Sequence, residues 1–182
     1  MGQKPDKPTA SKSTPAELQS LKGMHDLLPD QMPVMEKICK TARELLDFYN
    51  FQNIAVPVVE RLDLYNRTTG SASEIVEKQM FTLKTRGGEL LALRPEFTPS
   101  IVRSYIQHDM ERLTHPIKLF TIGPLFRYEQ PQAGRLRQFT QIDAEIFSIE
   151  NDAIYDAQAI LAAYRILDEL KVKNILIQIN SI

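Results

Sequence analysis

Residues 125–147 (LFRYEQPQAGRLRQFTQIDAEIF) constrain the fold of this 182-residue chain more than any other stretch. In their second part, Gln141, Asp143 and Glu145 lie two residues apart and therefore share one face of a strand, while apolar residues between them take the other face. Residues 130–138 contain a proline and a glycine, which end a strand. The stretch therefore predicts two strands joined by a loop, with charged side chains on one face.

The charges of this hairpin indicate what it could bind. Arg127 and Glu129 share a face of the predicted first arm, and Arg135 and Arg137 lie in the loop. Arginine presents a planar fork of donors that matches phosphate or carboxylate oxygens in pairs. Glu129 and Glu145 would repel a phosphate, so we expect them to face an amine, an ammonium or an imidazole. The hairpin could therefore bind a polyanion beside a small zwitterion. The alternative interpretation is an exposed hairpin whose charged side chains are only solvated and bind no ligand.

Periodicity predicts the elements before the hairpin. Apolar residues recur every three or four positions from about residue 32 to 49, which predicts an amphipathic helix. Residues 51–59 follow as a strand that Pro57 confines to an edge or an interface. Residues 61–78 have no strong period and are expected to be a polar connection. Two glycines after Arg86 predict a further hairpin between residues 80–83 and 89–93.

Two more helices and two more strands complete the prediction. Thr98 is expected to cap a helix with Pro99 at its first position, reaching Met110. A short strand is expected at residues 117–122. Asn151 or Asp152 can cap a second helix that runs to about residue 171, and the final residues, 172–182, are expected to form a strand. The inward side chains of this last helix are predicted to be Ile154, Ala157, Ile160, Leu161, Tyr164 and Leu167.

Composition limits the class of protein. The net charge of -1 means that any nucleic-acid contact must be local. One cysteine, Cys39, allows no internal disulfide, and three scattered histidines give no metal-ligand spacing. No apolar run approaches the ~20 residues needed to span a membrane. Residues 1–20 are rich in Lys, Pro, Ser and Thr, so we expect a disordered tail, and the absence of a signal-peptide pattern predicts a cytoplasmic protein.

Three blocks resemble the histidyl form of the class II aminoacyl-tRNA synthetases. Residues 126–129 (FRYE) and 131–139 (PQAGRLRQF), followed by Gln141 and Glu145, resemble motif 2 of that family. Two further blocks, GMHDLLP from Gly23 and LRPEFT ending at Thr98, resemble its opening and its substrate strand. The helix, strand and proline before them resemble motif 1. The resemblance covers about residues 21–182 and implies an α+β fold, an antiparallel β-sheet flanked by helices.

The resemblance also implies roles for individual residues. The catalytic residue would be Arg127, which grips the α-phosphate of ATP and the substrate carboxylate. Residues implied to bind ATP are Arg127, Glu129 and Arg135. Residues implied to bind histidine are Glu96, Thr98, Arg127, Gln141 and Glu145, with Glu145 accepting from the imidazole. Gln132 would contact the tRNA acceptor end, and no residue is assigned to a resident metal.

The family pattern implies partners and missing parts. Histidine, ATP with Mg²⁺ and tRNA(His) would be the substrates, a homodimer would form through the motif 1 region, and a loop at residues 70–76 would close over the substrates. Motif 3 and an anticodon-binding domain are not found in the sequence. Residues 21–182 are therefore expected to be the amino-terminal half of a truncated catalytic domain, inactive alone. Gln130 and Thr140 depart from the family pattern; by parity, Thr140 should point away from Gln141.

Two alternatives stay open. The regulatory subunit of ATP phosphoribosyltransferase shares the family fold and binds histidine without aminoacylation, but it does not need Arg127, Glu129 and Arg135 together. A synthetase for another amino acid, such as proline or threonine, has a similar hairpin. The position of Glu145 four residues after Gln141 favours the histidyl form over it.

Overall fold

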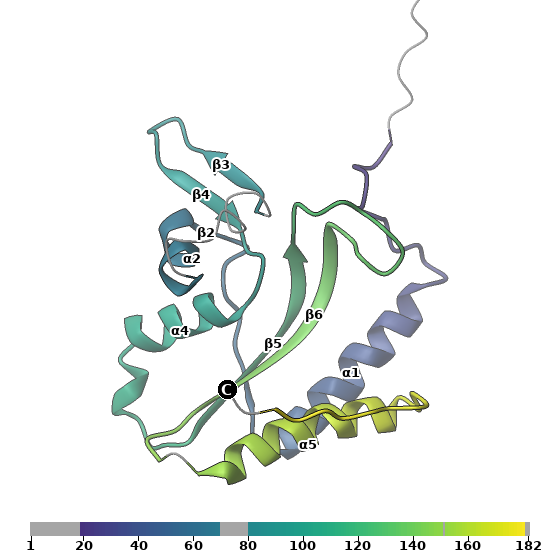
Figure 1. The fold of residues 1–182 in the computed structure, drawn as a ribbon, viewed down its shortest axis with the longest axis vertical. Helices are drawn as coiled ribbons and strands as arrows, with labels where there is room; N and C mark the ends of the chain where they lie inside the picture. Colours follow the sequence, from purple (N-terminus) through teal and green to yellow (C-terminus); the bar gives the residue numbers. More distant parts are fainter. Residues whose placement is uncertain (1–18, 70–79, 151, 181–182) are drawn as a thin grey trace, which may run out of the picture.

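The computed structural model describes residues 19–69, 80–150 and 152–180 (Figure 1). The predicted tail of residues 1–20 lies almost wholly outside these ranges, and so does the loop at residues 70–76. Asn151, one of the two candidate caps of the last helix, and the final two residues also lie outside them. The predictions for these segments stay predictions.

A three-stranded sheet carries the residues of the predicted hairpin. Its strands are β1 (Gln52–Asn53), β5 (Ile117–Phe126) and β6 (Gln138–Phe147), in the order β1-β5-β6. β5 and β6 are antiparallel over their whole length, and β1 is parallel to β5. The strand predicted at residues 117–122 is confirmed, but its predicted end was wrong, because β5 continues through Gly123 and Pro124 to Phe126. Consequently Arg127 and Glu129 follow the strand instead of lying within it.

Helices cover both faces of this sheet, which confirms the predicted α+β class (Figure 1). On one face, α1 (Met32–Phe48) and α5 (Ala153–Glu169) pack together against Ile142 and Ile146 of β6. On the other face, α4 (Thr98–Gln107) packs through Ile101 beside Phe139 and Phe147. The alternation of β6 therefore places its aliphatic residues on the α1 and α5 side and its polar residues on the α4 side.

The predicted strand at residues 51–59 was wrong as a single element. Residues 52 and 53 form β1 at the edge of the first sheet, whereas β2 (Val59–Arg61) belongs to a second sheet. Pro57 lies in the crossing between the two sheets, where its missing N–H removes no ladder hydrogen bond. Pro57 thus lies in the connection between β1 of the first sheet and β2 of the second sheet.

The second sheet supports the region before α4. β2, β4 (Leu90–Leu93) and β3 (Thr82–Lys84) are antiparallel in the order β2-β4-β3. The predicted hairpin between β3 and β4 is confirmed, and its turn uses Gly88 at φ +91°. The polar connection expected after Arg61 was wrong in part, because α2 (Leu62–Thr69) is helical. Its Tyr65 is buried with the hydroxyl 3.3 Å from that of Ser100.

α4 begins differently from the sequence prediction. Thr98 is its first residue and not its cap: Phe97 holds the cap position, without a side-chain hydrogen bond. The hydroxyl of Thr98 instead donates to the carboxylate of Glu145. Pro99 lies in the first turn as predicted, and the helix ends at Gln107, so Met110 lies in the following 3-10 turn, η1 (Met110–Arg112).

α5 begins as predicted but presents a different face to the core. The carboxylate of Asp152 accepts a hydrogen bond from the backbone N–H of Ile154, which confirms Asp152 as the cap. The predicted inward stripe was wrong, because the buried residues are Ala162 and Ile166. Apolar residues lie on both sides of this helix, so periodicity alone does not identify the buried face.

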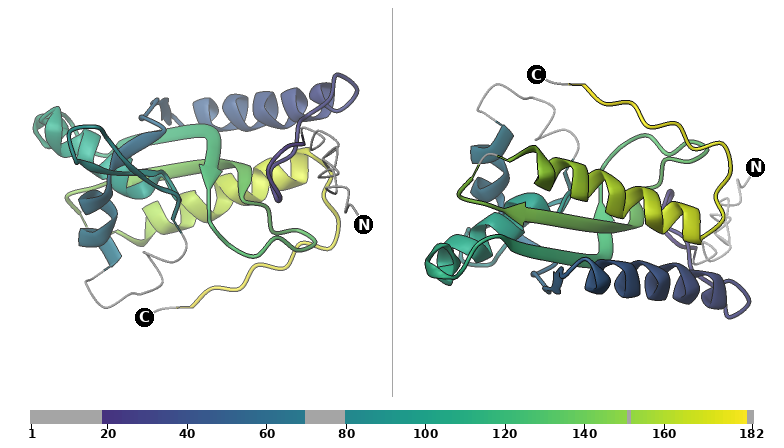
Figure 2. Two further views of the ribbon diagram at one scale, coloured as in Figure 1. Left: turned by 90° about the horizontal axis from the view of Figure 1, so that it is seen from above. Right: turned by 90° about the horizontal axis from the view of Figure 1, so that it is seen from below.

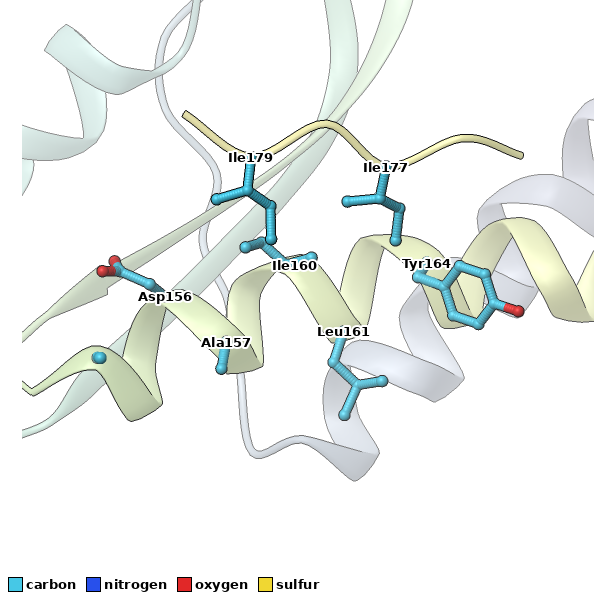
Figure 3. Close-up of a pocket in the computed structure, with 8 residues that line it drawn as sticks. Asp156, Ala157, Ile160, Leu161, Tyr164, Ile177 and Ile179 are labelled. Carbon is cyan, nitrogen blue, oxygen red and sulfur yellow. The ribbon is translucent and has the colours of Figure 1, made fainter. Parts of the chain in front are cut away.

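Four residues of the predicted stripe instead border an apolar cavity on the outer side of α5 (Figure 3): Ala157, Ile160, Leu161 and Tyr164. The predicted strand from residue 172 was also wrong, because residues 172–180 form no ladder with the described strands. Lys171 and Asn174 take left-handed conformations at the bend, and the chain then runs along the outer side of α5 (Figure 2). Ile177 and Ile179 line this open cavity of about 530 Å³ from the side opposite the helix (Figure 3). None of the described helices is long and apolar enough to cross a membrane.

Arg94 joins the two sheets from a buried position, with only 5% of its surface exposed. Its Nη1 donates to the carbonyls of Val56 at 2.7 Å and Pro57 at 3.3 Å, and its Nε donates to the carbonyl of Pro124 at 3.0 Å. The guanidinium lies 4.5 Å from the ring centroid of Phe97. Burial lowers the pKa of Arg94. One side chain therefore ties β5 to the crossing between the sheets.

Gly123 lies directly against this arginine, and we predict that Gly123→Ala destabilises the fold. An added Cβ would lie 2.9 Å from Arg94 Nη2, an atom that three hydrogen bonds from the same guanidinium hold in place. Overpacking of this kind costs about 1–3 kcal/mol. Gly87→Ala is the matched control, because its nearest neighbour would be 3.8 Å away. Urea unfolding followed by circular dichroism measures both, and equal midpoints would contradict the role of Arg94.

Candidate functional site

The predicted histidine-binding residues converge where α4 begins beside β6. Thr98, the first residue of α4, donates its hydroxyl to Glu145 Oε1 at 2.5 Å. Glu96 lies two residues before the helix, and Gln141 is on the same face of β6 as Glu145. The contact joins residues 47 positions apart in the sequence. The fold thus brings together four side chains that come from two separate segments.

Asp143 lies at the centre of this face, between Gln141 and Glu145. Gln141 Nε2 donates to Asp143 Oδ1 at 3.2 Å, while Oδ2 is buried and has no partner among the described residues. Burial, and then the charges of Glu145 and Glu96, raise the pKa of Asp143 to about 6, although the hydrogen bond from Gln141 opposes the shift. Three carboxylates therefore lie close enough to interact, and a cationic group such as an ammonium would relieve their repulsion.

Sequence reasoning placed Asp143 on this face but gave it no role. The signal that could have singled it out is its position between two candidate ligand residues in a strand of period two. Its unpartnered oxygen and raised pKa depend on the side chains around it, which only the folded chain brings together.

Arg127 lies at the end of β5, between the carboxylate face and the loop. Its Nε donates to the carbonyl of Pro95 at 3.0 Å, and its guanidinium carbon lies 5.1 Å from the ring centroid of Phe139. The ion pairs formed among the described residues do not include Arg127. The guanidinium is therefore held against the segment that carries Glu96, and its terminal nitrogens, which form no ion pair with the described residues, can bind an anion.

The loop between β5 and β6 borders an open cavity of about 480 Å³. It is lined by Arg127, Glu129, Gly134, Arg135, Leu136 and Phe139. Arg135 Nη1 lies 3.8 Å from Glu129 Oε2, but two thirds of the Arg135 side chain is exposed, so this pair is weak. The three residues predicted to bind ATP thus border one cavity, and Arg127 also reaches the segment that carries Glu96.

The remaining predicted positions lie around this cavity. Gln132 is exposed at the tip of the loop, where its backbone pairs with that of Arg135 beside Gly134 at φ +77°. Gln130 is also exposed. Thr140 pairs with Pro124 and, by the alternation of β6, lies on the face opposite to Gln141. Within the described ranges, no group of three or more His, Cys, Asp or Glu could hold a metal ion.

We predict that Asp143→Asn raises stability at neutral pH. Because the folded chain holds the proton of Asp143 up to about pH 6 and the unfolded chain releases it near 3.8, the free energy of unfolding falls as pH rises through this window. Asparagine keeps the acceptor for Gln141 but carries no charge. Melting temperatures at pH 4 and 7.5 should show the variant gaining over wild type only at the higher pH. Asp26→Asn, an exposed control, should show no such gain; a pH-independent difference for Asp143→Asn would contradict the shift.

Comparisons with known proteins identify the family. The family model described as histidyl-tRNA synthetase matches residues 23–182. The histidine-tRNA ligase of Aquifex aeolicus is 46% identical over 165 residues, which are 91% of this chain and 41% of that protein. The ligase of Desulforapulum autotrophicum is 43% identical over 165 residues, 91% of this chain and 39% of that protein. This chain thus spans about two fifths of the length of these relatives.

Solved structures agree with the sequence relatives. The apo histidyl-tRNA synthetase of S. aureus superposes with a TM-score of 0.72 at 32% identity, covering 86% of this chain and 35% of that one. A protein from Bacillus halodurans, described as an ATP phosphoribosyltransferase regulatory subunit/histidyl-tRNA synthetase, gives 0.67 at 27% identity, covering 84% of this chain and 39% of that one. With the family model matched across nearly all of its length, this chain belongs to the histidyl-tRNA synthetase family.

Proposed function

We propose that residues 21–182 supply the histidine-binding and adenine-binding part of a histidine-tRNA ligase. The observation that carries this proposal is the carboxylate face of β6 joined to the start of α4 through Thr98 and Glu145, next to the arginine-lined cavity. A zwitterionic amino acid needs acceptors for its ammonium and a cation for its carboxylate, and these two kinds of group adjoin here. The relatives named histidine-tRNA ligase support the same reaction.

In this proposal the carboxylate face binds histidine. Glu96, Thr98 and Gln141 hold the α-amino group, which explains why acidic and polar acceptors surround that point. Glu145 accepts a hydrogen bond from the imidazole, an interaction that most other amino acids cannot replace. The hydrogen bond from Thr98 fixes the carboxylate of Glu145 before histidine arrives.

The loop cavity binds ATP in the same proposal. Arg127 bridges the α-phosphate and the histidine carboxylate, Glu129 accepts from the adenine amine, and Arg135 contacts the distal phosphates. Mg²⁺ enters with ATP as part of the substrate. The histidine carboxylate attacks the α-phosphate, pyrophosphate leaves, and the histidyl group then passes to a ribose hydroxyl of tRNA(His). Such a reaction depends on positioning the substrates and on neutralising the charge of the phosphates. Arg127, which the carbonyl of Pro95 holds in place, is suited to both tasks.

The tRNA and dimer contacts are proposed for exposed parts of the chain. Gln132, at the loop tip, would contact the acceptor end of tRNA. A homodimer would form through the motif 1 region, and the exposed apolar side chains of Val34 and Phe48 on α1 support an interface there. A cytoplasmic location follows from this function.

A histidine-binding regulatory subunit of ATP phosphoribosyltransferase is the second candidate, and one structural relative carries that description. The loop cavity favours the ligase, because a protein that only senses histidine has no use for Arg127, Glu129 and Arg135 around a second pocket. ATP binding separates the two functions.

Catalytic tests need the rest of the active site, so we propose a chimera. In it, this chain replaces the matched segment of the Aquifex aeolicus ligase, with which it shares 46% identity. Histidine-dependent exchange of pyrophosphate into ATP by the chimera would support the ligase. A folded chimera that binds histidine but neither binds ATP nor exchanges pyrophosphate would contradict it and favour the regulatory subunit.

We predict that Glu145→Ala in this chimera weakens histidine binding at least tenfold and leaves ATP binding within threefold. The lost hydrogen bond to a charged group is worth about 1.5–3 kcal/mol. Separate calorimetric titrations with histidine and ATP measure the two effects. Glu111→Ala, which removes an exposed carboxylate from η1, is the control and should change neither. Equal losses for both ligands would remove Glu145 from the histidine pocket.

Arg127→Lys should slow pyrophosphate exchange roughly 100-fold, the usual loss when one preorganised donor is removed. Lysine keeps the charge but cannot contact Pro95 and a phosphate at once through a planar fork. The matched control is Arg86→Lys, in the exposed turn between β3 and β4. Circular dichroism verifies folding; wild-type exchange by the folded variant would exclude Arg127 from catalysis.

A further inference from the structure

The segment before α1 docks on the base of the loop between β5 and β6. The carbonyl of Gly23 accepts hydrogen bonds from the backbone N–H groups of Arg137 at 2.7 Å and Gln138 at 3.3 Å. Gly23 is buried and sits in a turn closed by the Met24 N–H and the Leu21 carbonyl. Residues more than a hundred positions apart are therefore in direct contact, and Figure 1 shows the segment running beside the loop.

The side chain of Arg137 strengthens this contact from the loop. Its Nε donates to the carbonyl of Glu129 at 2.9 Å, and its Nη1 donates to the carbonyl of Lys22 at 3.4 Å. The guanidinium carbon also lies 4.6 Å from the ring centroid of Tyr128. One guanidinium thus joins the outgoing arm of the loop, the returning arm and the segment before α1.

Arg135 and Arg137 have different environments although they are two residues apart. Arg135 lines the loop cavity and is largely exposed. Arg137 does not line the cavity, and its guanidinium donates hydrogen bonds to backbone carbonyls. The backbone N–H of Arg127 also donates to the carbonyl of Arg137 at 2.9 Å. The position of Arg127 therefore depends on the strand end that Arg137 and Gly23 hold.

We infer that the Gly23 turn and Arg137 form a clamp that fixes the base of the loop and sets the positions of Arg127 and Arg135. Arg137 is then a positioning residue that touches no substrate. The identity of the ligand, ATP, rests on the proposed function, but the clamp itself is a property of this chain. Loosening it should weaken ATP binding more than histidine binding, because histidine contacts only Arg127 of these two arginines and otherwise binds to β6 and α4.

Glycine is required at position 23 for two reasons. Its φ of +83° is left-handed, and an added Cβ would lie 2.8 Å from Pro131 Cγ and 3.1 Å from Arg137 Cγ. Gly88, in the turn between β3 and β4, offers a matched control: its φ is +91°, but an added Cβ would meet nothing within 4 Å. Gly23→Ala and Gly88→Ala therefore share the backbone strain and differ in contact with the loop.

Hydrogen-deuterium exchange on this chain tests the clamp without any activity. In Gly23→Ala we expect the protected amides of residues 127–138 to exchange at least tenfold faster than in wild type, and in Gly88→Ala within twofold of it. Arg137→Lys, which cannot reach both carbonyls through one ammonium, should also accelerate exchange there. Unchanged exchange in both Gly23→Ala and Arg137→Lys would overturn the clamp.

Ligand titrations of the chimera then test its consequence. In Arg137→Lys the dissociation constant for ATP, which uses both Arg127 and Arg135, should rise at least fivefold, while that for histidine, which uses only Arg127 of the two, should rise less than half as much. An equal rise for both ligands, or none for ATP, would overturn the positioning role. If the unsubstituted chimera bound neither ligand, the proposed function would fail, and hydrogen exchange would still decide the clamp.

Discussion

The buried guanidinium of Arg94 holds together the parts on which the site depends. A charged group out of water is stable only when its donors are satisfied, and here backbone carbonyls of Val56, Pro57 and Pro124 satisfy them. Those carbonyls belong to the crossing between the sheets and to β5. Because Arg94 directly precedes the segment that carries Glu96, its anchoring also sets where that carboxylate lies relative to β6.

Charge divides the site into two regions that share one framework. The face of β6 gathers Asp143 and Glu145, whereas the loop that follows β5 carries arginines. Arg127 lies at the boundary, held by the carbonyl of Pro95. A rigid antiparallel pair of ten-residue strands keeps the two regions adjacent, and the clamp through Gly23 gives the loop a base that the strands alone do not supply.

The sequence correctly predicted those structural features that depend on neighbouring residues in the chain. The alternation of β6, the hairpin at Gly88 and the cap at Asp152 each follow from neighbouring residues, and resemblance placed the candidate site residues. What failed depends on distant contacts. Thr98 donates to a carboxylate 47 residues away instead of capping its helix. α5 is apolar on both sides, so its buried face is chosen by its neighbours, and α2 is a short helix anchored by one buried tyrosine, Tyr65.

The hydrogen bond between Thr98 and Glu145 has a consequence for the balance between stability and recognition. A carboxylate already fixed in its rotamer loses little conformational entropy when a ligand arrives, so more of the interaction energy remains as affinity. The same arrangement keeps Glu145 near Asp143 and Glu96, whose mutual repulsion weakens the empty fold. The pocket is thus preorganised, but the repulsion between its carboxylates lowers the stability of the empty protein. A bound cation would offset that repulsion and raise the free energy of unfolding.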